Sequence, residues 1–339
     1  MLPRRLLTLL LALVLPTLAS ADEMVMKNGS ILIGTLVQAD EYQVIFNTPF
    51  AGDIVVRQEN IQTIVTDDKV TVLMHDGRIY KEKRIVSNED KLVLFSEDEP
   101  PVQFGVLDIE LVNPEPWRIG EGYNWKGYID TALAMERGNT DKDELDLSGE
   151  SIWRGIRDRY TLRGNWEIDE ANNERNKFRW AGRAKYDRFG QDRPDHYVGI
   201  QAAFEHDEFA DLDLRSVAGP YLGRQFLETS ILSLQGELGV VYVDEQFDVA
   251  EDDDYWGATW ELRWVSGVIP GIDIYADQTA IVSFTDTDNM LINTTVGTRF
   301  PVIYGFQASA EASWNYDGGA VDDVEELEEI YRFKLGYFW

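Results

Sequence analysis

A two-residue alternation of apolar and polar side chains recurs in about twelve segments between residues 117 and 339. In one of them, Phe178 and Trp180 alternate with Arg179 and Arg183. Successive side chains of a β-strand point to opposite faces, so each segment presents an apolar wall backed by a polar one. No segment has a convincing helical period, and the pattern therefore predicts an all-β fold.

The length of these segments separates a membrane barrel from a water-soluble sandwich, since both architectures alternate. Crossing a bilayer takes about 9–11 residues of strand, whereas soluble strands average about 5–6. Trp and Tyr recur near the segment ends, as the aromatic girdles of membrane barrels require. We therefore expect a transmembrane antiparallel β-barrel of about twelve strands at residues 117–339, in contact with outer-membrane lipid. The expected strands are roughly 125–136, 144–154, 160–169, 177–187, 196–207, 214–226, 231–243, 255–265, 272–284, 290–300, 304–316 and 328–339.

Connections between the segments differ in length. "DEQFDVAEDDDY" (residues 244–255) and "NYDGGAVDDVEELEE" (residues 315–329) are long and acidic, whereas "LETS" and "VSGVIPG" are short. Long external loops and short periplasmic turns are typical of outer-membrane barrels. An even number of strands then places both ends of the barrel on the periplasmic side.

The N-terminus has the pattern of an export signal. Arg4 and Arg5 precede an apolar run at residues 6–18 and the small residues Ala19-Ser20-Ala21. This pattern predicts a signal peptide at residues 1–21 that is cleaved after Ala21. After removal of the signal peptide with Arg4 and Arg5, the chain contains 29 basic and 61 acidic residues, which gives a formal charge of −32. Such an acidic chain lacks the electrostatic footprint of a nucleic-acid-binding protein.

Residues 22–116 differ in composition from the rest, because all ten tryptophans lie at or after Trp117. This part repeats itself: "NG" at residues 28–29 and "DG" at residues 76–77 lie 48 residues apart, each between extended runs. These dipeptides are hairpin signals. We expect two small SH3- or Sm-like β modules at residues 22–68 and 69–116, in the periplasm. They would serve either as a docking module for a periplasmic partner or as a spacer or plug.

The last strand ends on an aromatic residue. Its apolar face comprises Tyr331, Phe333, Leu335, Tyr337 and Trp339. A terminal barrel strand pairs with the first and leaves no unpaired backbone edge in lipid. This terminal pattern also resembles the signal that the barrel assembly machinery reads, so that machinery is an expected partner during insertion.

Short motifs at the start of the expected barrel resemble a known family. These are Trp125-Lys126-Gly127, Gly138-Asn139-Thr140 and Leu145-Asp146-Leu147-Ser148. Together with the aromatic end, they make residues 117–339 similar to the salt-induced outer membrane protein family, whose function is otherwise unknown. The resemblance implies an outer-membrane β-barrel with no established activity, and does not extend to residues 22–116.

Alternation also assigns charges to the inside of the barrel. Residues 117–193 carry 15 basic and 15 acidic side chains, whereas residues 194–339 carry 6 basic and 28 acidic ones. In a closed barrel the charges of these two walls face each other. Either they form ion pairs that close the lumen, or they line a narrow porin-like pore with a weak preference for cations. The charges expected to face inward are Arg163, Arg179, Arg183, Lys185, Glu237, Glu261, Asp273, Asp277 and Glu311.

The alternative to an envelope-structural or permeation role is a barrel enzyme such as a lipid hydrolase, which needs a histidine beside a serine. Only His75, His196 and His206 are available, and the sequence has neither G-x-S-x-G nor H-E-x-x-H. We therefore expect no catalysis, no catalytic residue and no cofactor.

Metal binding has one weak candidate. The acidic run at residues 244–254 offers Asp248, Asp252 and Asp254 as oxygen ligands for Ca²⁺, although it lacks the glycine and final glutamate of an EF-hand loop. A solvated external loop is the other interpretation of the same run.

Overall fold

A computed structural model describes residues 21–40, 42–88, 91–96, 100–105, 108–136, 142–171, 174–229, 231–269, 271–320 and 324–339. The predicted signal peptide, except Ala21, lies outside these residues. The chain forms two compact units, Met1–Pro114 and Glu115–Trp339. In the described part of the chain, no helix is both long enough and apolar enough to cross a membrane.

The first unit contains the two sequence repeats, each folded into five strands. Four of the five strand pairs begin 48 residues apart, so the repeats are structurally equivalent. The first repeat comprises β1(Asp22–Met26), β2(Ile31–Ala39), β3(Gln43–Thr48), β4(Gly52–Arg57) and β5(Ile61–Val65). The second comprises β6(Val70–Met74), β7(Ile79–Asn88), β8(Lys91–Phe95), β9(Val102–Gly105) and β10(Ile109–Val112).

The two repeats interlock instead of standing as separate modules. Strand β5 pairs with β7, and β10 pairs with β2, so each repeat gives its last strand to the second strand of the other. Met24 and Phe46 from the first repeat share one apolar core with Ile85 and Leu94 from the second. A repeat of under fifty residues buries too little apolar surface alone, which explains the shared core.

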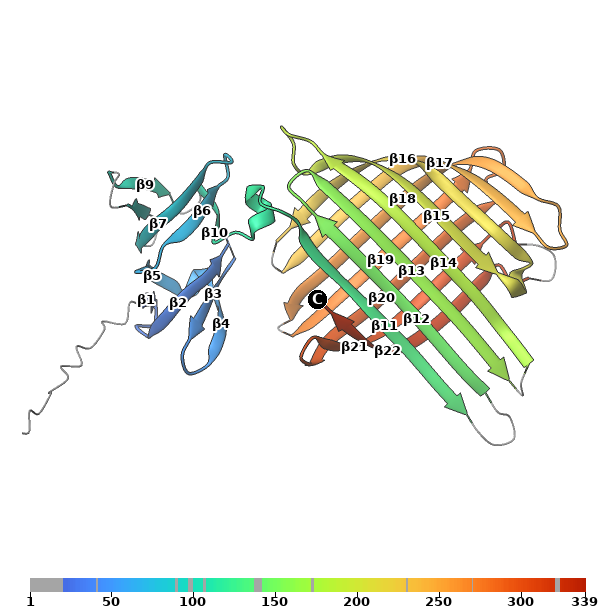
Figure 1. Ribbon diagram of the computed structural model, residues 1–339, viewed down its shortest axis with the longest axis horizontal. Helices are drawn as coiled ribbons and strands as arrows, with labels where there is room; N and C mark the ends of the chain where they lie inside the picture. The colour runs from blue at the N-terminus through green and yellow to red at the C-terminus, as the bar shows by residue number, and fades with distance from the viewer. Residues whose placement is uncertain are drawn as a thin grey trace, which may run out of the picture. The chain divides into compact units, whose positions relative to one another are not determined.

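The second unit is a closed antiparallel barrel whose twelve strands follow chain order (Figure 1). The predictions of an all-β fold and of twelve barrel strands are confirmed. The strands are β11(Asn124–Glu136), β12(Lys142–Arg154), β13(Asp158–Ala171), β14(Glu174–Phe189), β15(His196–Asp207), β16(Leu212–Glu228), β17(Leu232–Phe247), β18(Asp253–Ile269), β19(Ile272–Ser283), β20(Met290–Ile303), β21(Phe306–Asp317) and β22(Leu327–Phe338).

The outer wall of this barrel is apolar. Large hydrophobic side chains are exposed on it, while charged side chains such as Asp187 and Glu237 are buried inside. This inversion of a soluble protein's pattern is that of a transmembrane β-barrel. Exposed examples are Ile129, Leu147, Leu162, Val198, Ile200, Phe204, Leu222, Leu238, Trp256, Leu262, Val296, Phe300, Tyr331 and Phe333.

The long acidic loops that the sequence suggested are shorter than expected. Strand β17 continues to Phe247 and β18 begins at Asp253, so part of the acidic run lies in the ladder. Asp244 lies opposite Asp254 on paired strands. Like charges directly opposite are destabilising, so this end of the hairpin requires water around it. The strands therefore extend beyond the apolar wall.

The seam between β11 and β22 closes the barrel, and Figure 1 shows the two strands side by side. Gly127 and Trp339 exchange two backbone hydrogen bonds of 3.1 Å each. The Trp339 ring lies against Gly127, where a Cβ atom would come within 2.6 Å of it. Trp339 also contacts Trp125, with ring centroids 5.6 Å apart. The start and the end of the barrel thus fit together only because residue 127 has no side chain.

We predict that Gly127→Val will impair closure of the barrel, because the added side chain collides with Trp339 and with the Glu150 carbonyl. Gly182→Val is the matched control, since a Cβ atom there meets nothing within 4 Å. The readout is the fraction of refolded protein that keeps its compact, heat-modifiable migration in detergent gels. Equal fractions for both variants would show that the seam does not need the glycine.

Candidate functional site: the charged lumen

The inner wall of the barrel carries the charges that alternation assigned to it. All nine side chains expected to point inward line internal cavities: Arg163, Arg179, Arg183, Lys185, Glu237, Glu261, Asp273, Asp277 and Glu311. Five further charged residues line the same cavities and were not among the predicted nine, namely Glu150, Arg215, Arg263, Arg332 and Lys334. The same alternation applies to these five residues, so the pattern that identified the nine could have found them.

Four of these side chains form a closed ring of ion pairs across the lumen. Arg163 contacts Glu150 at 2.7 Å and Asp277 at 3.3 Å. Arg263 contacts the same two carboxylates, at 2.6 Å and 2.8 Å. Glu150 and Arg163 belong to β12 and β13, whereas Arg263 and Asp277 belong to β18 and β19. We call these four residues the ion-pair ring; it connects opposite walls of the barrel.

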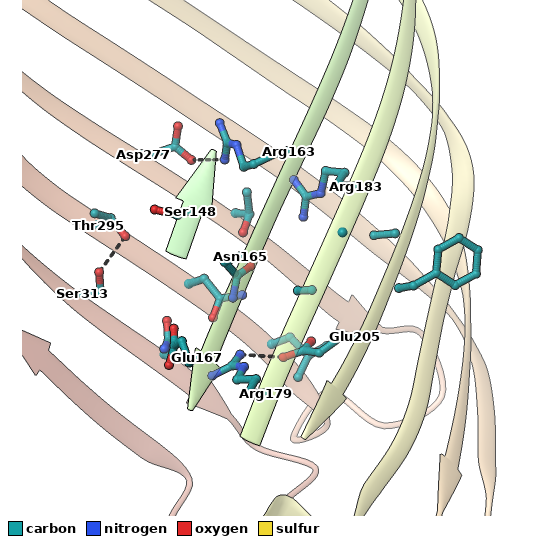
Figure 2. A pocket seen from close by; sticks show the side chains of 18 of the residues that line it. Ser148, Arg163, Asn165, Glu167, Arg179, Arg183, Glu205, Asp277, Thr295 and Ser313 are labelled. Carbon is teal, nitrogen blue, oxygen red and sulfur yellow. Dashed lines mark hydrogen bonds and ion pairs between the residues drawn. The ribbon is translucent and has the colours of Figure 1, made fainter. Parts of the chain in front are cut away.

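The ion-pair ring lies between two cavities. One, the near chamber, has a volume of about 740 Å³ and is lined by the first residues of β11 and the last of β12. The other, the middle chamber, has a volume of about 300 Å³ and is lined by the central parts of the strands. Arg163 and Asp277 line both chambers. Figure 2 looks into the middle chamber, where these two side chains meet at one end.

A second set of ion pairs lies at the other end of the middle chamber. Arg179 contacts Glu205 at 2.5 Å (Figure 2). Arg215 contacts the same carboxylate at 3.3 Å. Arg215 also reaches Asp317 on β21 at 2.7 Å. Beyond this set, which we call the far junction, lies a cavity of about 350 Å³ at the end where β21 and β22 are connected. Ion pairs therefore divide the lumen at two levels.

A lysine on β14 adds a third link across the inner wall. Lys185 Nζ lies 2.5 Å from Glu237 and 2.8 Å from Glu261, and all three side chains are buried. Tyr197 donates a hydrogen bond of 2.8 Å to Glu237. Taking such charges out of water is costly, and here partners on several strands compensate for that cost. The arrangement fixes the spacing of strands that lie far apart in the sequence.

A short segment before the barrel covers the mouth of the near chamber. The 3-10 helix η3(Pro116–Ile119) places Trp117 there with only 7% of its surface exposed. Its ring centroid lies 5.4 Å from the Arg154 guanidinium carbon. The Trp117 indole and Asn124 both donate hydrogen bonds to Glu115. From the sequence, Trp117 marked only the start of the aromatic-rich half, because its place in the mouth depends on the closed barrel.

The five side chains of the expected assembly signal lie on the outer wall. Tyr331, Phe333, Leu335, Tyr337 and Trp339 are each between 40% and 83% exposed. The rings of Tyr337 and Trp339 are stacked, with their centroids 6.4 Å apart. This end of the seam is therefore an apolar and aromatic surface.

The three histidines are dispersed. His75 is exposed in the first unit. His196, the first residue of β15, lies 2.9 Å from Asp195 in the preceding turn, and this contact lowers the pKa of the Asp195 carboxyl. His206 contacts the Asp213 carbonyl at 2.7 Å. Within the described residues, no histidine is hydrogen-bonded to a serine hydroxyl, the arrangement that a hydrolase would use.

The structure does not bring the three calcium candidates together. Asp252 accepts a hydrogen bond from the Phe247 amide, and Asp254 accepts one from the Tyr242 hydroxyl on β17. The Asp248 amide donates to the Asp211 carbonyl. Across the part of the chain that the structure describes, no three His, Cys, Asp or Glu side chains gather closely enough to hold a metal ion.

Comparison with known proteins identifies a family and some distant relatives. The family described as "Protein of unknown function, DUF481" matches residues 129–339. "Uncharacterized protein YdiY" of Escherichia coli (strain K12) is 23% identical over 221 residues, covering 63% of this chain and 82% of YdiY.

Two solved structures are also similar over most of their own length. The NanC porin shares 9% identity and a TM-score of 0.38 over 63% of this chain and 99% of its own. The translocator domain of autotransporter NalP from Neisseria meningitidis shares 11% sequence identity with a TM-score of 0.35. The match covers 65% of this chain and 88% of that domain. At these TM-scores, neither likeness carries an argument about what the chain does.

We predict that replacing both arginines of the ion-pair ring, Arg163→Ala with Arg263→Ala, will join the near and middle chambers. Ionic conductance of the refolded barrel in planar bilayers should rise several-fold, because two bulky side chains leave and two carboxylates remain. Arg188→Ala is the control, since Arg188 is half exposed and pairs with Asp158 near a strand end. Unchanged conductance in the double variant would show that the ring does not limit passage.

Proposed function

Because this chain belongs to the DUF481 family, whose function is unknown, we propose its role from the lumen: an outer-membrane β-barrel with a narrow, weakly cation-preferring path for passive permeation. The observation that carries this proposal is the ion-pair ring between two cavities on the barrel axis. The two cavities have volumes of about 740 Å³ and 300 Å³, and the side chains of the ion-pair ring narrow the lumen between them. Small ions therefore pass, while larger solutes do not.

The preference for cations follows from the charge balance of the walls. Between residues 194 and 339, acidic side chains outnumber basic ones by 28 to 6. Ion pairs with basic side chains neutralise only part of this excess of acidic side chains. Carboxylates along a pore favour the passage of cations, because their negative charge attracts cations and repels anions. The field inside the lumen is thus weakly negative on average.

A second candidate function is an envelope-structural role with a sealed lumen. The observation that favours it is the number of independent links between opposite walls, such as Arg163 with Asp277 and Arg215 with Asp317. Twelve strands lie between barrels of about eight strands, which side chains fill, and open pores of about sixteen. Conductance of the purified barrel separates the two candidates: a silent but folded barrel supports the structural role.

We place the first unit in the periplasm. The twelve-strand count supports this arrangement, because an even number returns both ends of the barrel to one side of the membrane. The segment that leads into β11 lies at the near chamber, which we therefore assign to the periplasmic side. The interlocked repeats serve there as a docking module for a periplasmic partner or as a spacer. The resemblance to the salt-induced outer membrane protein family adds the proposal that expression rises with external salt.

The alternative to both the permeation role and the structural role is an enzymatic one, such as lipid hydrolysis. The non-enzymatic proposal is supported by the surroundings of the three histidines. His75 lies in the first unit, His196 and His206 lie near opposite ends of β15, and none has a serine partner among the described residues. Phospholipid hydrolysis by the refolded barrel, abolished by His196→Ala or His206→Ala, would replace the permeation proposal.

We predict that Glu261→Gln with Glu311→Gln will weaken the cation preference. Both carboxylates line the lumen, and amides of nearly the same size remove two negative charges without emptying the wall. Reversal potentials in a salt gradient across a planar bilayer measure the preference. A wild-type preference for anions would refute the proposed selectivity.

We predict that the mature chain will fractionate with the outer membrane and that deleting Trp339 will lower its level there. The deletion removes a lipid-facing aromatic residue and the two backbone bonds that join it to Gly127. Cell fractionation and immunoblotting after limited periplasmic proteolysis provide the measurement. Recovery of the wild-type chain in the soluble periplasmic fraction would overturn the assignment.

A further inference from the structure

Two arginines in the near chamber differ from the other cations of the lumen. Ten inward-facing cations each lie within 4 Å of a carboxylate: Arg159, Arg163, Lys177, Arg179, Arg183, Lys185, Arg215, Arg263, Arg332 and Lys334. Arg154 and Arg299 also line the near chamber, yet neither forms an ion pair with any residue that the structure describes. Instead, aromatic rings hold both of them.

Arg154, near the end of β12, lies against two rings. Its guanidinium carbon is 3.4 Å from the Phe189 centroid and 5.4 Å from that of Trp117. Its Nη1 atom is buried and has no hydrogen-bond partner among the described residues. Cation–π contacts hold a guanidinium in place without satisfying its N–H donors. The two rings therefore hold the Arg154 guanidinium in place, and its free N–H donors can still bind a hydrogen-bond acceptor.

Arg299 on β20 has the same kind of surroundings. Three rings approach its guanidinium carbon, those of Phe338 at 4.5 Å, Tyr275 at 5.0 Å and Tyr128 at 5.7 Å. Its Nε atom is also buried and lacks a partner in the described part of the chain. The two arginines come from strands on different sides of the lumen and line one cavity.

Among the acidic residues that line the near chamber, Glu228 and Asp273 form no ion pair with a residue that the structure describes. Glu228 is exposed at the rim, where water screens its charge. Asp273 lies opposite Arg299 on the paired strand β19, but the two do not form an ion pair of 4 Å or less. Asp273 is thus the neighbouring charge that competes most directly for Arg299.

We propose that Arg154 and Arg299 make the near chamber a binding site for small organic anions that carry carboxylate or phosphate groups. Planar guanidinium donors match both groups in geometry and charge, and charge-assisted bonds satisfy donors that the protein leaves open. A volume of about 740 Å³ is within the usual range for sites that bind small molecules. The site lies on the η3 side of the ion-pair ring, so a bound anion enters by the mouth that Trp117 covers.

The inference goes beyond permeation, because binding requires neither conductance nor cation preference. It also makes the lumen asymmetric: acidic groups dominate the later strands, whereas two unpaired guanidinium groups lie in the near chamber. An anion held there faces the ion-pair ring, which contains two further arginines.

The test is isothermal titration calorimetry of the full mature chain, refolded in an uncharged detergent, with citrate as the carboxylate probe and glycerol 3-phosphate as the phosphate probe. We expect saturable binding of at least one probe. Arg154→Gln and Arg299→Gln should each weaken it about tenfold, the effect of losing one charge-assisted hydrogen bond. Asp273→Asn should strengthen binding, because it removes the competing carboxylate.

Arg188→Gln is the matched control, since this arginine is half exposed and paired with Asp158. Each variant is first shown to be folded by its heat-modifiable migration. The absence of saturable binding of both probes to the wild-type barrel would overturn the proposal. The proposal would also be overturned if the Arg154→Gln and Arg299→Gln variants bound the probe as strongly as the Arg188→Gln control.

Discussion

Closure of the sheet between β11 and β22 is the constraint on which the rest of this molecule depends. In hydrocarbon an unpaired backbone edge has no water to bond to, so a spanning sheet must pair every strand. Here the seam relies on the reciprocal bonds of Gly127 and Trp339 and on the contact between the Trp339 ring and Trp125. The closed sheet then separates side chains into an outer wall that meets lipid and an inner wall that does not.

Once the barrel is closed, the inner charges have to neutralise one another across a confined space. The early strands are rich in arginine and lysine and the late strands in aspartate and glutamate, which looks unbalanced along the sequence. Closure brings the two groups face to face. Arg163 on β13 thereby pairs with Asp277 on β19, and the ion-pair ring and the far junction divide the lumen into cavities. The proposed permeation path, the structural alternative and the proposed anion site all depend on where these ion pairs form and where they do not.

Alternation along each strand predicted the barrel and the side on which each charge lies, because a side chain's face depends only on its position in the strand. It did not predict partners: Arg163 and Asp277 are 114 residues apart and meet only after closure. It misjudged the ends of β17 and β18, since acidic residues suggested a loop where the ladder continues to the pair of Glu245 and Asp253. It also gave no sign of the role of Trp117, whose burial depends on the mouth of the finished barrel.

We propose that ion pairs close most of the lumen and leave paths only for small ions. Liposome swelling with a neutral sugar such as arabinose tests it most directly, because an uncharged solute responds to the width of the path and not to its charge. We expect liposomes that contain the wild-type barrel to swell no faster than protein-free liposomes. Swelling at the rate of an open porin would contradict it.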